Sequence, residues 1–271
     1  MSTSTRSGGD LLREWRQRRR LSQLELACRA DVSTRHLSFI ETGRSQPSRE
    51  MVLHLAEHLA IPIRERNVLL TAAGYAPSFP ERSLDDPGLA AARAAVELVV
   101  NGHEPFPALA IDRHYTLVAS NDAATRLLDG VGPALLHPPV NVLRLSLHPD
   151  GLAPRIANLR EWRAHLLARL AHQIDVTADA TLVALQRELR DLPVPETAES
   201  QAAASGRNYA GVVVPLRLVT GAGILSLFST TTVFGTPIDI TLAELALEAF
   251  YPADDSTAEV LRAVARRRGA E

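Results

Sequence analysis

The stretch covering residues 22–49 constrains the fold more than any other part of the chain, because it reads as two short helices joined by a tight turn. Ser22 and Glu25 have the spacing of a capping box, which predicts the start of the first helix. Ser33 is placed to cap the second helix, and Gly43 can end it in a left-handed conformation. The segment therefore predicts a compact helix–turn–helix unit.

The second of these helices has one apolar and one polar face. Leu37 and Ile40 lie three residues apart and are expected to face the core. Thr34, Arg35 and Ser38 must then face outward near the start of the helix. In helix-turn-helix proteins this end of the second helix contacts base edges in the major groove.

Helices are also predicted on both sides of this segment. Residues 11–21 form a basic amphipathic pattern upstream, with Leu11, Leu12 and Trp15 on the apolar side. Two more helices are expected downstream, one beginning at residues 47–48 and one over residues 63–73. Five helices within the first 76 residues predict an all-α DNA-binding domain.

This pattern resembles the phage-repressor-like (XRE-type) helix-turn-helix family over residues 9–74. The resemblance implies that Gln23 contacts the DNA backbone, that Thr34, Arg35 and Ser38 read bases, and that Arg44 and Ser45 touch phosphates. It also implies a structural ion pair between Arg16 and Glu41. With Ser33 at the helix start, the candidate DNA-binding residues are Gln23, Ser33, Thr34, Arg35, Ser38, Arg44 and Ser45.

Arg35 is the strongest single candidate, because its fork can bond guanine O6 and N7 together. Two features remain open: Phe39 fits either packing or contact with a thymine methyl group, and residues 18–20 are three arginines that fit either phosphate contact or a solvated helix end. His54 and His58 have the spacing of metal ligands on a helix, but no third ligand is evident, so we expect no metal.

The charge distribution agrees with an N-terminal DNA-binding domain. The 271-residue chain has a formal net charge of −2, which alone argues against a nucleic-acid partner. Residues 1–80, however, hold 12 Arg and 8 acidic residues, a net of +4, whereas residues 81–271 carry a net of −6. The phosphate-seeking surface is therefore expected in the N-terminal third.

Localisation is predicted from what the sequence carries at its start and along its length. One cysteine, Cys28, precludes an intrachain disulfide, and the polar first ten residues do not resemble a secretory signal. No stretch approaches the roughly 20 apolar residues of a membrane span. We expect a soluble, cytoplasmic protein.

The remainder of the chain predicts an α+β domain. Residues 77–102 read as a proline-rich linker and a connecting helix, and residues 103–271 as the second domain. Its pattern is a strand pair at 108–111 and 115–119, then helices over 142–147, 156–174 and 178–189, then strands over 211–219, 223–231 and 242–251, and a closing helix over 258–268. This order suggests an antiparallel sheet with helices on one face.

This second domain resembles PAS domains in its opening and, more widely, the MmyB-like ligand-binding domain of bacterial regulators. The segments that carry the resemblance are residues 111–124, 141–145, 148–152, 158–162, 234–245 and 250–255. The resemblance implies a small, mostly apolar ligand, with fatty-acid-like molecules as candidates. Trp162, Phe228 and Phe234 are the candidate ligand-binding residues, and ordinary core packing is the alternative for each.

The sequence contains no convergent catalytic motif, so we expect no enzymatic activity, and no cofactor is predicted. The predicted function is a sequence-specific transcriptional regulator, a repressor acting as a homodimer on double-stranded DNA and controlled by an apolar ligand. One alternative is a DNA-binding protein whose second domain only dimerises or binds a protein partner. Another is an enzyme with an attached DNA anchor.

Overall fold

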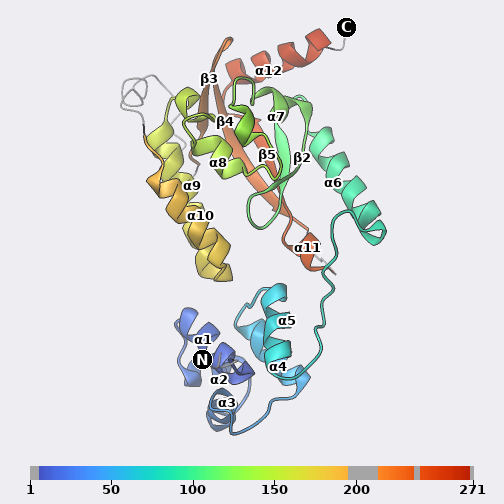
Figure 1. Cartoon of the computed structure of the whole chain (residues 1–271), viewed down its shortest axis with the longest axis vertical. Helices are drawn as coiled ribbons and strands as arrows, with labels where there is room; N and C mark the ends of the chain where they lie inside the picture. The colour runs from blue at the N-terminus through green and yellow to red at the C-terminus, as the bar shows by residue number, and fades with distance from the viewer. Residues whose placement is uncertain (1–5, 195–212, 235–238, 269–271) are drawn as a thin grey trace. The chain divides into compact units, whose positions relative to one another are not determined.

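A computed structural model describes residues 6–194, 213–234 and 239–268 of the chain (Figure 1). The chain divides into two compact units: the first comprises the residues up to Arg82 with two short later segments, Asp175–Thr177 and residues 239–243, and the second comprises the remaining described residues. Each unit is described by itself below.

The first unit consists of helices, as the sequence predicts. Serine side chains cap the first four of them, at Ser7, Ser22, Ser33 and Ser48. Because Ser7 and Asp10 form a capping box, the first helix begins at Gly8, three residues before the expected start. The five helices are α1 (Gly8–Arg18), α2 (Gln23–Arg29), α3 (Thr34–Glu41), α4 (Arg49–His58) and α5 (Ile63–Ala72).

Aliphatic side chains from these helices form the core of the first unit. Gly9 of α1 lets the backbone of α3 approach closely, since a Cβ atom there would lie 2.3 Å from the carbonyl oxygen of Ile40. The close contact fixes α3 against α1. The largest fully buried side chains of this core are Leu12, Leu26, Leu37, Ile40, Leu55, Leu59, Ile61, Leu69 and Leu70.

The proline-rich segment after α5 packs on the first unit. The Asn67 side-chain oxygen accepts hydrogen bonds from the backbone N–H groups of Ser78 and Phe79, at 2.8 and 3.1 Å. The Tyr75 hydroxyl donates to the Pro47 carbonyl at 2.8 Å. Residues 75–79 are therefore held by the Asn67 side chain of α5 and by the Pro47 carbonyl.

The second unit is α+β, as expected. The strand at 108–111 and the helix at 142–147 have the predicted bounds, whereas the strand expected over 115–119 runs from Leu117 to Ser120. The described elements that follow α5 along the chain, of which α11 belongs to the first unit, are α6 (Ala90–Gly102), β1 (Ala108–Ile111), β2 (Leu117–Ser120), α7 (Asp122–Arg126), α8 (Val142–Leu147), α9 (Leu159–Thr177), α10 (Ala180–Asp191), β3 (Leu216–Thr220), β4 (Gly223–Val233), α11 (Ile240–Ala243), β5 (Ala246–Pro252) and α12 (Asp255–Arg268), with short 3-10 turns at Pro87–Leu89, Pro133–Leu135 and Ala153–Arg155.

The strands form one antiparallel sheet in the order β2-β1-β5-β4-β3. The strand expected over residues 242–251 begins at Ala246 instead, because residues 240–243 form the helical turn α11. β5 lies at the centre of the sheet, paired with β1 and β4. Part of the strand expected over 211–219 lies outside the described residues.

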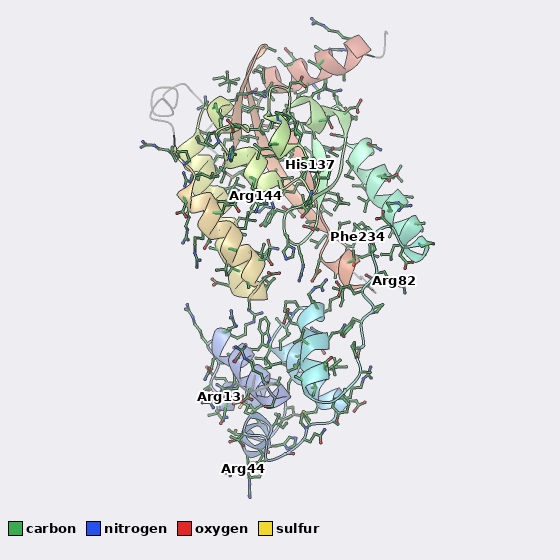
Figure 2. The ribbon with its side chains drawn as sticks, viewed as in Figure 1. Arg13, Arg44, Arg82, His137, Arg144 and Phe234 are labelled. Carbon is green, nitrogen blue, oxygen red and sulfur yellow. The ribbon has the colours of Figure 1, made fainter. Side chains whose placement is uncertain are left out.

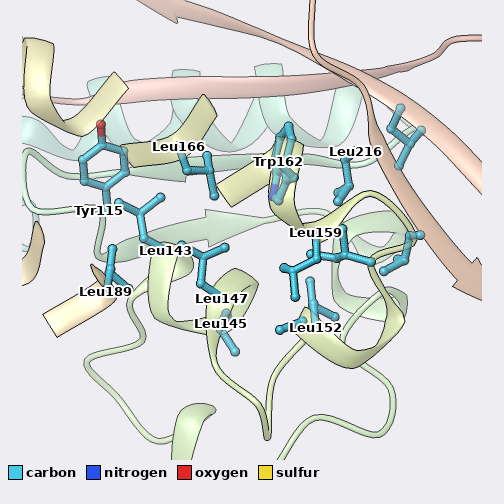
Figure 3. Close-up of a cluster of buried hydrophobic side chains, with 14 of the residues drawn as sticks. Tyr115, Leu143, Leu145, Leu147, Leu152, Leu159, Trp162, Leu166, Leu189 and Leu216 are labelled. Carbon is cyan, nitrogen blue, oxygen red and sulfur yellow. The ribbon is translucent and has the colours of Figure 1, made fainter. Parts of the chain in front are cut away.

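Helices cover both faces of the sheet, so the prediction of helices on one face is wrong. α6 packs on the face that carries Ala108, Ala110 and Leu247. The opposite face packs against α8, α9 and α10, and Figure 1 shows α6 and the α9–α10 pair on opposite sides of the sheet. Figure 3 shows the main core on that second face, where Leu143, Leu145, Leu159, Trp162, Leu166 and Leu216 meet.

Candidate nucleic-acid interface and ligand cavity

α3 presents its first turn to solvent, because its apolar residues anchor it from behind. Leu37 and Ile40 are 0% and 1% exposed, whereas Arg35 is exposed and Thr34 and Ser38 are half-buried. The Ser33 hydroxyl accepts a hydrogen bond from the backbone N–H of His36 at 3.1 Å, so its structural role is the helix cap. The face of α3 that the sequence predicts to be outward is therefore the one that faces solvent.

Two arginines flank the Phe39 ring on this surface. The guanidinium carbon of Arg35 lies 5.3 Å from the ring centroid and that of Arg44 lies 5.9 Å from it. Cations at this range are attracted to the face of an aromatic ring. Phe39 therefore brings Arg35, the base-reading candidate, and Arg44, the phosphate-contact candidate, together on one surface. The sequence analysis did not predict this role for Phe39.

The loop after α3 displays Arg44. Gly43 takes the left-handed conformation expected of a helix C′ residue, with φ of 71°. The backbone N–H groups of Arg44 and Ser45 then donate to the Phe39 carbonyl, at 2.8 and 3.1 Å. Figure 2 shows the Arg44 side chain extending away from the ribbon.

Gln23 is joined to a buried ion pair. Arg16 donates through Nε and Nη2 to the two carboxylate oxygens of Glu41, at 2.7 and 2.8 Å, which confirms the ion pair implied by the resemblance. The Gln23 amide donates to the same carboxylate at 2.8 Å. Hydrogen bonding to Glu41 raises the pKa of Arg16 against the opposing effect of burial.

Other polar candidates of this unit have partners within it. Arg19 caps the end of α4, donating to the carbonyls of Leu59 and Ala60 at 2.8 and 3.0 Å. His54 Nε2 lies 2.7 Å from the Ala30 carbonyl oxygen, and its ring meets that of His58 edge to face. Among the described residues, no three His, Cys, Asp or Glu side chains group as metal ligands.

The second unit contains a cavity of about 90 Å³ between the sheet and helices α7, α8 and α9. One buried water needs about 10–15 Å³ on this scale, so the space is large enough for several waters or a short apolar chain. Two serines and Glu248 are the polar members of its described lining. The apolar members are Pro107, Leu109, Leu117, Ala124, Leu127, Leu128, Val142, Leu143, Leu145, Leu152, Trp162, Leu166, Leu216 and Phe250.

Of the three predicted ligand-binding aromatics, only Trp162 lines this cavity. Its indole N–H donates to the Ser146 hydroxyl at 2.9 Å. Phe228 of β4 is paired with Tyr251 of β5, and their rings stack with 5.5 Å between the centroids. Phe234 packs against the apolar cluster formed by α6 and the sheet. Because strand side chains alternate between faces, both phenylalanines point away from the cavity.

One residue of the cavity wall, Glu248, belongs to a charged pair with Arg169. Glu248 of β5 is 7% exposed and accepts a hydrogen bond from Nη2 of Arg169 on α9. Arg169 also lies over the Tyr115 ring, and the Tyr115 hydroxyl donates to the Gln173 side-chain oxygen at 2.7 Å. Burial raises the pKa of Tyr115. Burial alone would lower the pKa of Arg169, but the charge of Glu248 and the hydrogen bond to it have the larger effect, so the pKa of Arg169 is raised.

Glu248 and Phe250 are among the many lining residues that the sequence analysis did not predict. They lie two residues apart on the central strand and so share one face of the sheet. The signal was present, because a lone glutamate within a run of apolar strand residues is rarely buried without a partner or a function.

Within the described residues, no helix combines the length and apolar character that crossing a bilayer requires.

Two family models match the chain. The model of the MmyB-like transcription regulator ligand binding domain matches residues 92–264, and a helix-turn-helix domain model matches residues 9–69. Both matches agree with the two architectures described above.

Individual proteins match more narrowly. A putative HTH-type transcriptional regulatory protein of Methanoculleus marisnigri (strain ATCC 35101 / DSM 1498 / JR1) is 38% identical over 116 residues, which is 41% of this chain. The chain spans 37% of the length of that relative. A structure of an RNA-binding Light-Oxygen-Voltage receptor aligns over 96% of this chain and 65% of that chain, with 14% identity and a TM-score of 0.27, from which no shared fold follows.

Proposed function

The chain belongs to the MmyB-like transcription regulators and carries a helix-turn-helix domain ahead of its ligand-binding domain, and from this premise we propose that it represses transcription under the control of a small apolar molecule. In this proposal α3 reads the operator and the cavity beside Trp162 holds the effector.

The observation that carries the DNA-binding part is the surface formed by Arg35, Phe39 and Arg44. Leu37 and Ile40 bury the opposite side of α3, and the exposed Arg35 and Arg44 both lie against the Phe39 ring. In this proposal the Arg35 guanidinium donates hydrogen bonds to a guanine edge, and the Arg44 guanidinium contacts a phosphate.

The test is selection of an operator from random duplexes, followed by affinity measurements on single-base variants of it. We expect Arg35→Ala to lose about 1–3 kcal/mol on the operator and to relax preference at one base pair. Arg13→Ala is the matched control, because Arg13 is also exposed and lies on α1. Equal loss by both variants on every sequence would contradict base reading by Arg35.

We further propose that a homodimer binds a near-palindromic operator, because one recognition helix contacts too few base pairs for specific binding. Sedimentation of the protein with operator duplex checks this, and a one-to-one complex of chain and duplex at saturation would overturn it.

The apolar lining of the cavity supports effector control. By linkage, an effector that weakens operator binding must itself bind less tightly to the operator complex, by the same factor. Native mass spectrometry of the purified protein, with titration of its ligand in the presence and absence of operator, tests both parts. A cavity that takes up no apolar molecule would favour the alternative, in which the second domain only dimerises or binds a protein partner.

A further inference from the structure

The connection between β4 and β5 carries a short segment that belongs to the first unit. Residues 239–243, which include α11, group with the residues up to Arg82, although they come long after Arg82 in the chain. α11 contacts α5 of that unit. Residues 239–243 are called the strap below, because the chain returns through them from the sheet to the helical unit.

Hydrogen bonds and a buried apolar side chain hold the strap on the first unit. Ile240 is 1% exposed, and its backbone N–H donates to the Pro80 carbonyl at 2.9 Å. The Thr241 hydroxyl donates to the Arg82 carbonyl at 2.6 Å. The strap is therefore fixed to residues 80–82 by its backbone and by its side chains.

Asp239 shapes the strap and places a buried charge in it. Its Oδ1 accepts a hydrogen bond from the backbone N–H of Thr241 at 2.9 Å, which caps α11. The Asp239 side chain is 1% exposed, and its Oδ2 lies 3.7 Å from Nε of Arg82 and accepts no hydrogen bond from the described residues. Because a buried carboxylate is costly without an opposite charge, the Arg82 guanidinium favours the docked position of the strap.

The strap is joined closely to the strand that lines the ligand cavity. Glu244 is the one residue between the strap and Leu245, which is 1% exposed in the apolar cluster formed by α6 and the sheet. β5 follows at once, and its Glu248 and Phe250 belong to the cavity wall. One residue spans at most about 3.6 Å, so this joint has little slack.

We propose that the strap couples the ligand cavity to the DNA-reading unit. A ligand that shifts β5 loosens or tightens the strap on residues 80–82, and this changes the stability of the first unit and its affinity for the operator. The two states are the strap docked and the strap released, and a ligand shifts the balance by as much as it prefers one of them. This inference rests on the proposed effector site and names the route by which its occupancy reaches DNA binding.

The first experiment tests the docking of the strap without any ligand. Trp15 lies in the first unit and Trp162 in the second, so Trp15 fluorescence in a Trp162→Phe background follows urea unfolding of the first unit in the full-length protein. We expect Ile240→Ala to lower the urea midpoint of that transition by about 1 M. Val233→Ala is the matched control, because Val233 also flanks the β4–β5 connection but is 62% exposed, and it should leave the midpoint unchanged.

The second experiment tests the coupling on the protein with wild-type tryptophans. Operator affinity is measured with and without saturating decanoate, and insertion of Gly-Ser-Gly between Glu244 and Leu245 adds slack to the joint. We expect decanoate to change operator affinity by at least about fivefold in the wild type and by less than about twofold in the insertion variant, with decanoate affinity unchanged. The same insertion between Arg82 and Ser83 is the control, since it leaves the strap joined to β5, and it should keep the wild-type ratio.

The outcomes separate this inference from the proposed function. An unchanged midpoint in Ile240→Ala, or a wild-type ratio after insertion beside Leu245, overturns the strap and leaves DNA binding and effector binding in place. If Ile240→Ala fails to fold, the two insertion variants decide. If decanoate does not bind, the proposed effector site fails and the coupling role of the strap fails with it.

Discussion

Substitution of Glu41 tests whether a buried ion pair holds the DNA-reading helix in place. Glu41 is the last residue of α3, and its carboxylate accepts three hydrogen bonds of 2.7–2.8 Å from Arg16 and Gln23. The Arg16 and Glu41 side chains are 10% and 1% exposed. Glu41→Ala would leave the Arg16 guanidinium buried with the Leu21 carbonyl as its remaining protein acceptor.

The expected loss is about 3–5 kcal/mol in the free energy of unfolding, the usual cost of removing one partner of a buried pair. The two tryptophans of the chain lie in different units, so in a Trp162→Phe background the fluorescence of Trp15 reports the unfolding of the first unit alone. The measurement is urea unfolding followed by fluorescence. A second variant, Arg16→Met with Glu41→Leu, removes both charges and should recover most of the loss, since no charge is then left unpaired.

Glu14→Ala is the control for this prediction. Glu14 pairs with Arg6 at 3.0 Å, but the two side chains are 46% and 67% exposed, so its loss should stay within about 1 kcal/mol. If Glu41→Ala costs no more than Glu14→Ala, the pair contributes no more than a surface salt bridge and the reasoning is refuted.

Three other perturbations address the same domain. Gly9→Ala should destabilise it by about 1–3 kcal/mol, because the new Cβ meets the Ile40 carbonyl oxygen; an unchanged urea midpoint would contradict that close contact. Phe39→Leu should weaken operator binding by up to roughly tenfold, because the ring no longer holds the two guanidinium groups in place and each cation–π contact contributes about 0.5–1 kcal/mol; unchanged affinity would show that the ring does not hold Arg35 and Arg44. The logarithm of operator affinity should fall linearly with the logarithm of salt concentration, and Arg44→Ala should reduce that slope by about one; a wild-type slope in the variant would exclude Arg44 as a phosphate contact.

The helical domain was predictable because its signals are local. Ser22 with Glu25, and Ser33 with the apolar pair that follows it, fix two helix starts within a few residues. The start of α1 was misplaced because Gly8 and Gly9 disfavour a helix by propensity. The capping box at Ser7 and the contact with α3 override that preference.

The ligand cavity was less predictable because it depends on strand register. Phe228 is large and lies on a strand, but a shift of one residue decides which face of the sheet it occupies. Its neighbour Leu227 lies on the main-core face, whereas Phe228 stacks on Tyr251. No local pattern in the sequence predicts which face Phe228 occupies, because that is set by the register of β4 against β5, about twenty residues further along the chain.

Two of the arginine–glutamate pairs, Arg16 with Glu41 and Arg169 with Glu248, differ in what surrounds the carboxylate. In the first unit, Arg16 and Gln23 occupy both oxygens of Glu41, so the pair has no acceptor to offer. In the second unit, Arg169 bonds to one oxygen of Glu248, and the carboxylate belongs to the wall of a cavity. Desolvation of a carboxylate is costly unless its lone pairs are satisfied, so the first arrangement is complete in itself. The carboxylate of the second pair borders a cavity, so the hydrogen bonds that it accepts beyond the one from Arg169 depend on what occupies that space.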